Sequence, residues 1–223
     1  MNNESPITPA DAAMRPGPAF PADPLPDDPR LRRLVGVYQQ RQETLVLQRV
    51  RITGGRLTGP QWHALADIAR RWTAATPLHL TTRQDIEIHD LPPDRVPDVQ
   101  RAMLAAGLTG LGACGDTPRN ITVCPCSGLK PATADLLPLA RHVHEVLLGC
   151  QQVFELPRKF KISLSACHEA CGLPWINDLG LVASPRAGQW GFRAIGAGSL
   201  GPRPATGIEL FDWLPAADVA PLA

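Results

Sequence analysis

The spacing of apolar residues in the first third of the chain predicts strands and helices in turn. A run rich in valine and leucine between positions 35 and 53 predicts one or two strands, which end at the turn Gly54-Gly55. After this turn, apolar residues recur at helical spacing as far as Trp72, with Thr58 as the helix N-cap and Pro60 in the first turn. We therefore expect a helix that packs one face on a sheet.

The next segments extend the same pattern. Residues 78–82 predict another strand, and residues 86–89 predict a further one because apolar and polar side chains alternate there. A second amphipathic helix is predicted over 96–104 and stops near Gly107. The order of these segments is typical of a small split α+β unit, which we assign to residues 31–108.

A second unit is predicted over residues 109–217. It begins with a loop rich in cysteine and glycine, followed by a helix over 136–148 that Pro138 interrupts. The strand predicted at its centre runs directly into a loop that contains two cysteines. Three short apolar segments predict the strands of this unit: residues 160–164, 179–183 and 191–195.

Composition limits the class of protein and the role of the N-terminal segment. Residues 1–30 hold eight of the 24 prolines and few large apolar side chains, which predicts a disordered Pro-rich tail. The formal net charge of +1 gives no reason to expect nucleic acid or an anionic membrane as a partner. There is no apolar run long enough to span a bilayer and no secretory signal pattern, so we expect a cytoplasmic protein.

Cationic side chains recur at strand ends in both predicted units. Arg49 and Arg51 share one face of a strand, and Lys159 and Lys161 share one face of another. Converging Arg and Lys side chains can hold a small oxyanion, and a Lys with a depressed pKa can supply protons. The alternative is that each is a solvated surface charge, and the residues alone leave both interpretations open. The set comprises Arg49, Arg51, Arg83, Arg119, Lys159 and Lys161.

Five of the six cysteines lie in the short segments 114–126 and 167–171. In a cytoplasmic chain this clustering favours metal or cluster ligation over a disulfide framework, although buried thiols that act as small apolar groups are the alternative. The sixth, Cys150, ends an apolar helix pattern and is expected to be such a buried thiol. Four thiolates can hold a [4Fe–4S] cluster or a zinc ion, and the candidate ligands are Cys124, Cys126, Cys167 and Cys171.

Several of these segments together resemble the siroheme-dependent sulfite/nitrite reductase family, in the family's order. The resemblance covers about residues 31–217 and implies a ferredoxin-like half domain followed by a siroheme/[4Fe–4S] domain. Most members carry this pair twice in one chain, related by pseudo-two-fold symmetry, and this sequence carries it once. The matching segments are GVYQQRQETLVLQRVRITGGRLT (36–58), LTTRQDIEIHDL (80–91), GACGDTPRNITVCPCSG (112–128), LPRKFKISLSACHEAC (156–171) and NDLGLVASPRAGQWGFRAIGAGSLG (177–201).

The resemblance also implies roles for individual residues. The substrate oxyanion would be bound by Arg49, Arg119, Lys159 and Lys161. Siroheme would be contacted by Arg83, with Gln84 beside it, and Asn120 is grouped with these cofactor-binding residues. The C-x3-C loop would supply two cluster ligands, and its second cysteine, Cys171, would bridge the cluster and the siroheme iron.

One departure from the family pattern concerns the cluster ligands. The family has C-x5-C before C-x3-C, and Cys124 matches the first position, whereas Lys130 stands where the second cysteine is expected. Cys126 would have to replace it, or Cys114 would have to join the site.

The resemblance predicts an oxidoreductase that reduces sulfite or nitrite, with electrons from a ferredoxin or a reductase subunit. A homodimer or a partner carrying the second repeat is also expected. Two alternatives stay open: a precorrin-3B synthase-like oxidation of a tetrapyrrole, and a non-catalytic electron carrier or partner subunit. A structural zinc domain is the weakest alternative because zinc has no use for the cationic set. No nucleotide-binding fingerprint that would name the electron donor is present.

Overall fold

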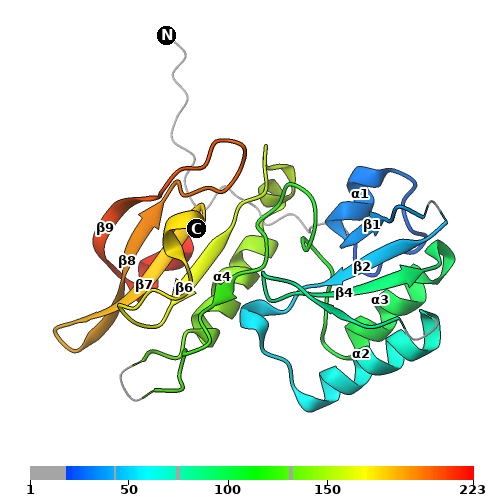
Figure 1. The fold of residues 1–223 in the computed structure, drawn as a ribbon, viewed down its shortest axis with the longest axis horizontal. Coiled ribbons are helices and arrows are strands. Elements are labelled where there is room, and N and C mark those ends of the chain that lie inside the picture. Colours follow the sequence, from blue (N-terminus) through cyan, green and yellow to red (C-terminus); the bar gives the residue numbers. More distant parts are fainter. Residues whose placement is uncertain (1–18, 43, 74–75, 131–132) are drawn as a thin grey trace, which may run out of the picture.

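The computed structural model describes residues 19–223 except 43, 74–75 and 131–132, so most of the predicted tail lies outside the described residues. The chain forms two units, each with its own sheet and its own apolar core, and Figure 1 shows them side by side. No helix in the described ranges is both long and apolar enough to cross a membrane.

The first unit is a four-stranded antiparallel sheet with helices α2 and α3 on one face (Figure 1). Its strand order is β1-β2-β4-β3, so the predicted split α+β arrangement is confirmed. The elements are α1 (Pro29–Leu34), β1 (Val37–Gln39), β2 (Val46–Val50), the 3-10 turn η1 (Thr53–Gly55), α2 (Gly59–Trp72), β3 (His79–Leu80), β4 (Ile86–Leu91), η2 (Pro93–Arg95) and α3 (Val96–Ala105).

Helix α2 begins where the sequence predicts. The Thr58 hydroxyl accepts a hydrogen bond from the Gln61 N–H, and the Gln61 side chain accepts one from the Thr58 N–H, which completes a capping box. Leu65 is fully buried against the sheet, as the helical spacing requires. Trp62, which the same spacing assigns to the core face, is 44% exposed instead.

The tail prediction is wrong for residues 19–30. Ala22 is buried in the first core, and its N–H donates to Gln100 Oε1 at 2.7 Å. The Asp28 carboxylate caps α1, whose first residue is Pro29. A few apolar side chains, Phe20 among them, therefore anchor a proline-rich segment that its composition alone assigns to solvent.

The second unit is a five-stranded mixed sheet. Strands β5, β6 and β7 are parallel, and β7, β8 and β9 form an antiparallel meander. The elements are β5 (Thr122–Val123), α4 (Leu137–Leu148), η3 (Gln151–Glu155), β6 (Ile162–Ser165), η4 (Pro174–Ile176), β7 (Leu179–Arg186), β8 (Gln189–Gly196), β9 (Ile208–Pro215), η5 (Ala216–Asp218) and α5 (Val219–Leu222).

Two predictions for this unit need correction. Pro138 lies in the first turn of α4 and does not interrupt it, because a proline there loses no helical hydrogen bond. The unit also continues beyond residue 217, since Val219 on α5 is fully buried in the second core. Strand β9 was not predicted, because its side chains are mostly exposed and show no alternation.

Candidate functional site

Four arginines from three stretches of the chain lie near one buried carboxylate, Asp85, which sequence reasoning did not single out. Burial raises the pKa of Asp85 to about 6, although the charges of Arg51, Arg49 and Arg119 oppose this shift. Arg83 also interacts with the charge of Asp85. The four arginines of the predicted cationic set are therefore brought together, and their positive charge is only partly balanced by Asp85.

Arg83 is fixed by the second unit. Its Nη1 donates to Asn177 Oδ1 at 2.9 Å, and its Nη2 donates to the carbonyls of Asn120 at 2.7 Å and Ile162 at 3.0 Å. Burial lowers the pKa of Arg83 to about 10. Asn177, which the sequence argument missed, is thus part of what positions this side chain.

Arg51 and Arg119 are both buried. Arg51 Nη2 donates to the carbonyls of Pro118, at 2.6 Å, and Gly112, and burial lowers the pKa of Arg51 to about 10. Arg119 is only 9% exposed, and its Nε has no hydrogen-bond partner within the described residues. A buried cationic donor without an acceptor favours an anion beside it.

Arg49 is held at the other side of this group by Glu87. Its Nε and Nη2 donate to Glu87 Oε1 at 3.0 and 2.5 Å, and its Nη1 donates to the Ala113 carbonyl at 3.3 Å. Burial raises the pKa of Cys114 to about 12, against the charges of Arg49 and Arg119, which both lie near this thiol. Cys114, which the sequence offers as a spare cluster ligand, therefore lies with the arginines.

Lys159 and Lys161 extend the cationic group toward solvent. The pKa of Lys159 is lowered by partial burial and by the nearby charges of Arg119 and Lys161. Lys159 is exposed and Lys161 half-buried. Arg119 and the two lysines are therefore neighbours, as the resemblance implies.

A cavity of about 400 Å³ lies between two of the cationic residues and the cysteine loops. Arg83 and Lys161 line it together with Cys124 and Cys171, which come from four different segments of the chain. Its volume is within the usual range for small-molecule sites. The remaining lining residues include Thr82, Gln84, Thr122, Gly172 and Asn177.

Three of the candidate cysteines form a group. The pKa of Cys171 is raised by burial, by the neighbouring Cys124, with which Cys171 shares a hydrogen bond, and by the charge of Cys167. Cys124 is buried, and its Sγ accepts a hydrogen bond from the Ala166 N–H at 3.2 Å. A sulfur that accepts a backbone N–H suits a thiolate ligand.

Cys126 and Lys130 follow Cys124 in the chain, and their contacts differ. Cys126 is half-buried and packs against the second core. Lys130 Nζ lies 3.9 Å from Glu169 Oε2, and Glu169 belongs to the loop between Cys167 and Cys171. The position where the family pattern expects a cysteine therefore holds a cation paired with the C-x3-C loop. Cys150, expected to be buried, is half-exposed, and its Sγ donates to Gln152 Oε1.

Gln84 and Asn120 mainly fix the backbone around the cavity. The Gln84 amide bonds in both directions to the main chain of Val123. Asn120 Nδ2 donates to the carbonyls of Ile52 at 2.7 Å and Arg83 at 2.9 Å. Asn120 Oδ1 is buried and has no partner among the described residues.

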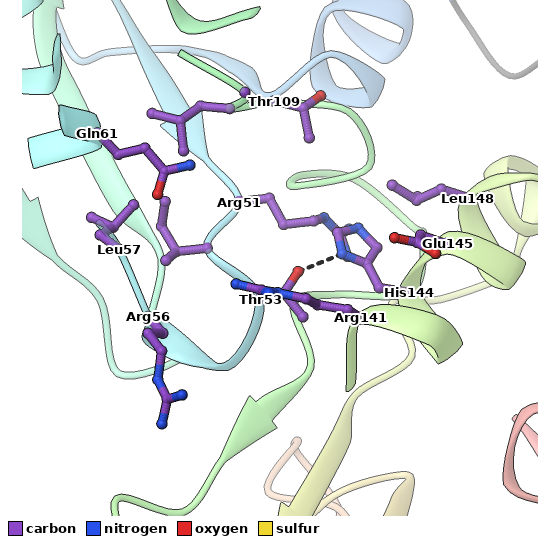
Figure 2. Close-up of a pocket in the computed structure, with 13 residues that line it drawn as sticks. Arg51, Thr53, Arg56, Leu57, Gln61, Thr109, Arg141, His144, Glu145 and Leu148 are labelled. Atoms are coloured by element: carbon purple, nitrogen blue, oxygen red, sulfur yellow. Dashed lines mark hydrogen bonds between the residues drawn. The ribbon is translucent and has the colours of Figure 1, made fainter. Parts of the chain in front are cut away.

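A second cavity of about 560 Å³ lies between η1 and α4 (Figure 2). Figure 2 shows Arg51 and His144 reaching toward one another, with His144 Nδ1 hydrogen-bonded to Thr53 Oγ1. Burial and then the charge of Arg51 lower the pKa of His144 to about 3. Residues of both units line this cavity, so it lies at their junction. Arg51 is the one member of the predicted cationic and thiol sets among its lining residues.

Comparison with known families agrees with this arrangement. Residues 38–106 match the nitrite/sulfite reductase ferredoxin-like half domain, and residues 114–223 match the nitrite and sulphite reductase 4Fe-4S domain. The chain belongs to the nitrite/sulfite reductase family. Both the predicted fold class and the predicted oxidoreductase family are thereby confirmed, and siroheme with [4Fe–4S] is confirmed as the family's cofactor pair.

Individual relatives span both branches of the family. The chain is 32% identical to an assimilatory ferredoxin-dependent nitrite reductase of Haloferax mediterranei, over 84% of this chain and 36% of the relative. It is 31% identical to a sulfite reductase [NADPH] hemoprotein beta-component of Acidithiobacillus ferrooxidans, over 78% of this chain and 38% of the relative. It thus spans little more than a third of the curated relatives it matches.

Among solved structures, the Mycobacterium tuberculosis NirA protein has the same fold. The TM-score is 0.77 at 23% sequence identity, and the match covers 85% of this chain and 38% of that one.

Proposed function

We propose that this chain binds siroheme and a [4Fe–4S] cluster at the 400 Å³ cavity and takes part in the reduction of sulfite or nitrite. The observation that carries the proposal is the buried Arg119, whose Nε lacks an acceptor among the described residues and whose charge acts on Lys159. Lys161, a neighbour of Lys159, lines a cavity together with two cysteines. An oxyanion supplies the missing negative charge.

The residues present fit the two groups. Cys124, Cys167 and Cys171 offer three neighbouring thiols, and we propose Cys126 as the fourth cluster ligand. Arg83 lines the same cavity and suits the carboxylates of a tetrapyrrole. When bound, the siroheme iron and the cluster supply the electrons for the reduction.

The protein side chains would manage charge and protons. Arg49 and Arg119 neutralise the bound anion, and Arg119 acts from a largely desolvated position, where electrostatic interactions are strong. Lys159 and Lys161 complete the anion site. Because the pKa of Lys159 is lowered by burial and by Arg119, this lysine gives up a proton more readily than an ordinary lysine.

The partners are proposed from the relatives' names. Those names describe ferredoxin-dependent and NADPH-linked enzymes, and we propose a ferredoxin or a reductase subunit as the electron donor here. Because the chain spans little more than a third of these relatives, we also propose that a second repeat, from another copy or a partner, completes the active assembly. We place the protein in the cytoplasm, where free thiols persist.

The proposal is tested on protein co-produced with siroheme synthesis and handled without oxygen. We expect siroheme absorption bands and about four further irons with matching sulfide, and turnover of sulfite or nitrite with a reduced dye. Lys159→Ala is expected to slow turnover with the cofactors still bound, whereas Arg203→Ala, which removes an exposed arginine elsewhere in the second unit, keeps the rate. Colourless protein, or a Lys159→Ala rate equal to wild type, contradicts the proposal, and oxidation of a tetrapyrrole without anion turnover favours the precorrin-type alternative.

A further inference from the structure

A row of polar side chains crosses the first sheet next to Arg49. Arg49 on β2 is the cross-strand partner of Glu87 on β4, and Glu87 is the partner of His79 on β3. His89 lies two residues beyond Glu87, so both side chains project from the same face. Glu87 Oε1 accepts hydrogen bonds from Arg49 Nε and Nη2, and Glu87 Oε2 lies 3.0 Å from His89 Nε2.

The protonation of His89 follows from its other neighbour, Gln40. The Asp90 N–H can only donate, so the Gln40 atom that lies 2.8 Å from it is Oε1. The Gln40 amide nitrogen therefore donates to His89 Nδ1 at 3.1 Å. His89 Nδ1 is an acceptor, and the ring proton is on Nε2, from which it is donated to Glu87.

This arrangement decides between two roles for the cluster. The ligand atoms of His79, Glu87 and His89 all lie within 4.8 Å of one another, which suits a metal ion. A metal on His89 Nε2 requires the ring proton to be on Nδ1. That proton would point at the N–H of the Gln40 amide nitrogen, so two donors would face each other. The hydrogen bonds therefore favour a network without metal, in which His79 stacks on the His89 ring at 4.2 Å.

We propose that Glu87 and His89 are positioning residues for Arg49 in the anion site, which rests on the function proposed above. Gln40 fixes His89, His89 holds one oxygen of Glu87, and Glu87 holds the Arg49 guanidinium by Nε and Nη2. Arg49 Nη1 reaches Ala113, in the segment that leads to Arg119. The network thereby sets where Arg49 presents its charge.

The network is read directly by the ¹H–¹⁵N resonance of Arg49 Nε, identified by its loss in Arg49→Lys. We expect His89→Ala to shift this resonance and to speed its exchange with water about fivefold, because one hydrogen bond of about 1 kcal/mol is lost. His89→Gln, whose amide N–H can replace Nε2–H, restores the wild-type resonance. His63→Ala, an exposed histidine on α2, leaves it unchanged.

Catalysis gives a second readout on the holoprotein. His89→Ala keeps both charges of the Arg49–Glu87 pair, so we expect its KM for the anion to rise about threefold to fivefold with kcat unchanged, on the same hydrogen-bond estimate. An unchanged Arg49 resonance in His89→Ala overturns the network. So does stoichiometric binding of Zn²⁺ that both His79→Ala and His89→Ala abolish. A changed resonance with an unchanged KM supports the network and counts instead against Arg49 as an anion ligand.

Discussion

The side chain of Gln84 pairs with the main chain of Val123 as a neighbouring strand would. Gln84 Nε2 donates to the Val123 carbonyl at 2.7 Å, and the Val123 N–H donates to Gln84 Oε1 at 3.0 Å. Gln84 precedes β4 of the first unit and Val123 lies on β5 of the second, so this pair joins the two units at the wall of the cavity.

Removal of this pair is expected to destabilise the protein. Gln84→Ala leaves the N–H and C=O of the buried Val123 without partners, and we expect the free energy of unfolding to fall by about 2–3 kcal/mol. Gln84→Glu keeps the acceptor but sets a carboxylate oxygen against the Val123 carbonyl, so we expect a loss at least as large. Urea unfolding measures both, with the exposed Gln189→Ala as control. A loss below that of Gln189→Ala contradicts the role of Gln84.

His144 is expected to make the folded protein less stable as the pH falls. Its pKa in the folded state is lowered from 6.5 to about 3 by burial and by Arg51, so between these values the unfolded state binds a proton that the folded state does not. The stabilising contribution is complete above pH 6.5 and is lost as the pH falls, by about 1.4 kcal/mol per unit.

The test compares urea unfolding at several pH values. We expect His144→Gln to lose less stability than wild type between pH 6.5 and pH 4, and the exposed His142→Gln to follow wild type. Parallel pH curves for wild type and His144→Gln contradict a His144 that stays neutral in the folded state.

The cysteines differ in what they are expected to hold. We expect serine substitution of Cys124, Cys126, Cys167 or Cys171 to lower cluster iron and sulfide, since each removes a thiolate ligand. Cys150→Ser serves as the control because Cys150 contacts Gln152 and is remote from the group in sequence. Full iron and sulfide content in Cys126→Ser, with loss in the other three, excludes Cys126 as the fourth ligand.

The sequence predicts most helices and strands of the first unit because they depend on local spacing, and it names the arginines that the structure places near Asp85 because they lie in recognisable segments. The capping box at Thr58 and the helix over 96–104 are local features, and the structure contains them. Asp85 and Asn177 escaped notice because their importance depends on burial next to arginines distant in sequence. Likewise, the anchoring of Ala22 depends on Gln100, 78 residues away, which no local pattern reveals.

The thiol site was only partly predictable for a similar reason. The sequence names Cys124, Cys126, Cys167 and Cys171 as candidate ligands, and in the structure Cys171 interacts with Cys124 and with Cys167. It does not reveal that Lys130 approaches Glu169 or that Cys126 packs against the second core, because both contacts depend on how two loops meet.

The most direct test of this account is a sulfite titration of the holoprotein, followed by the siroheme absorption bands. Arg119→Met removes a buried cation whose Nε lacks a partner among the described residues, and we expect its Kd for sulfite to rise at least about tenfold, since a charged hydrogen bond contributes about 1.5–3 kcal/mol. Arg158→Met removes an exposed cation from the adjacent loop and is expected to keep the wild-type Kd. Equal Kd values for wild type and Arg119→Met contradict an oxyanion site centred on Arg119.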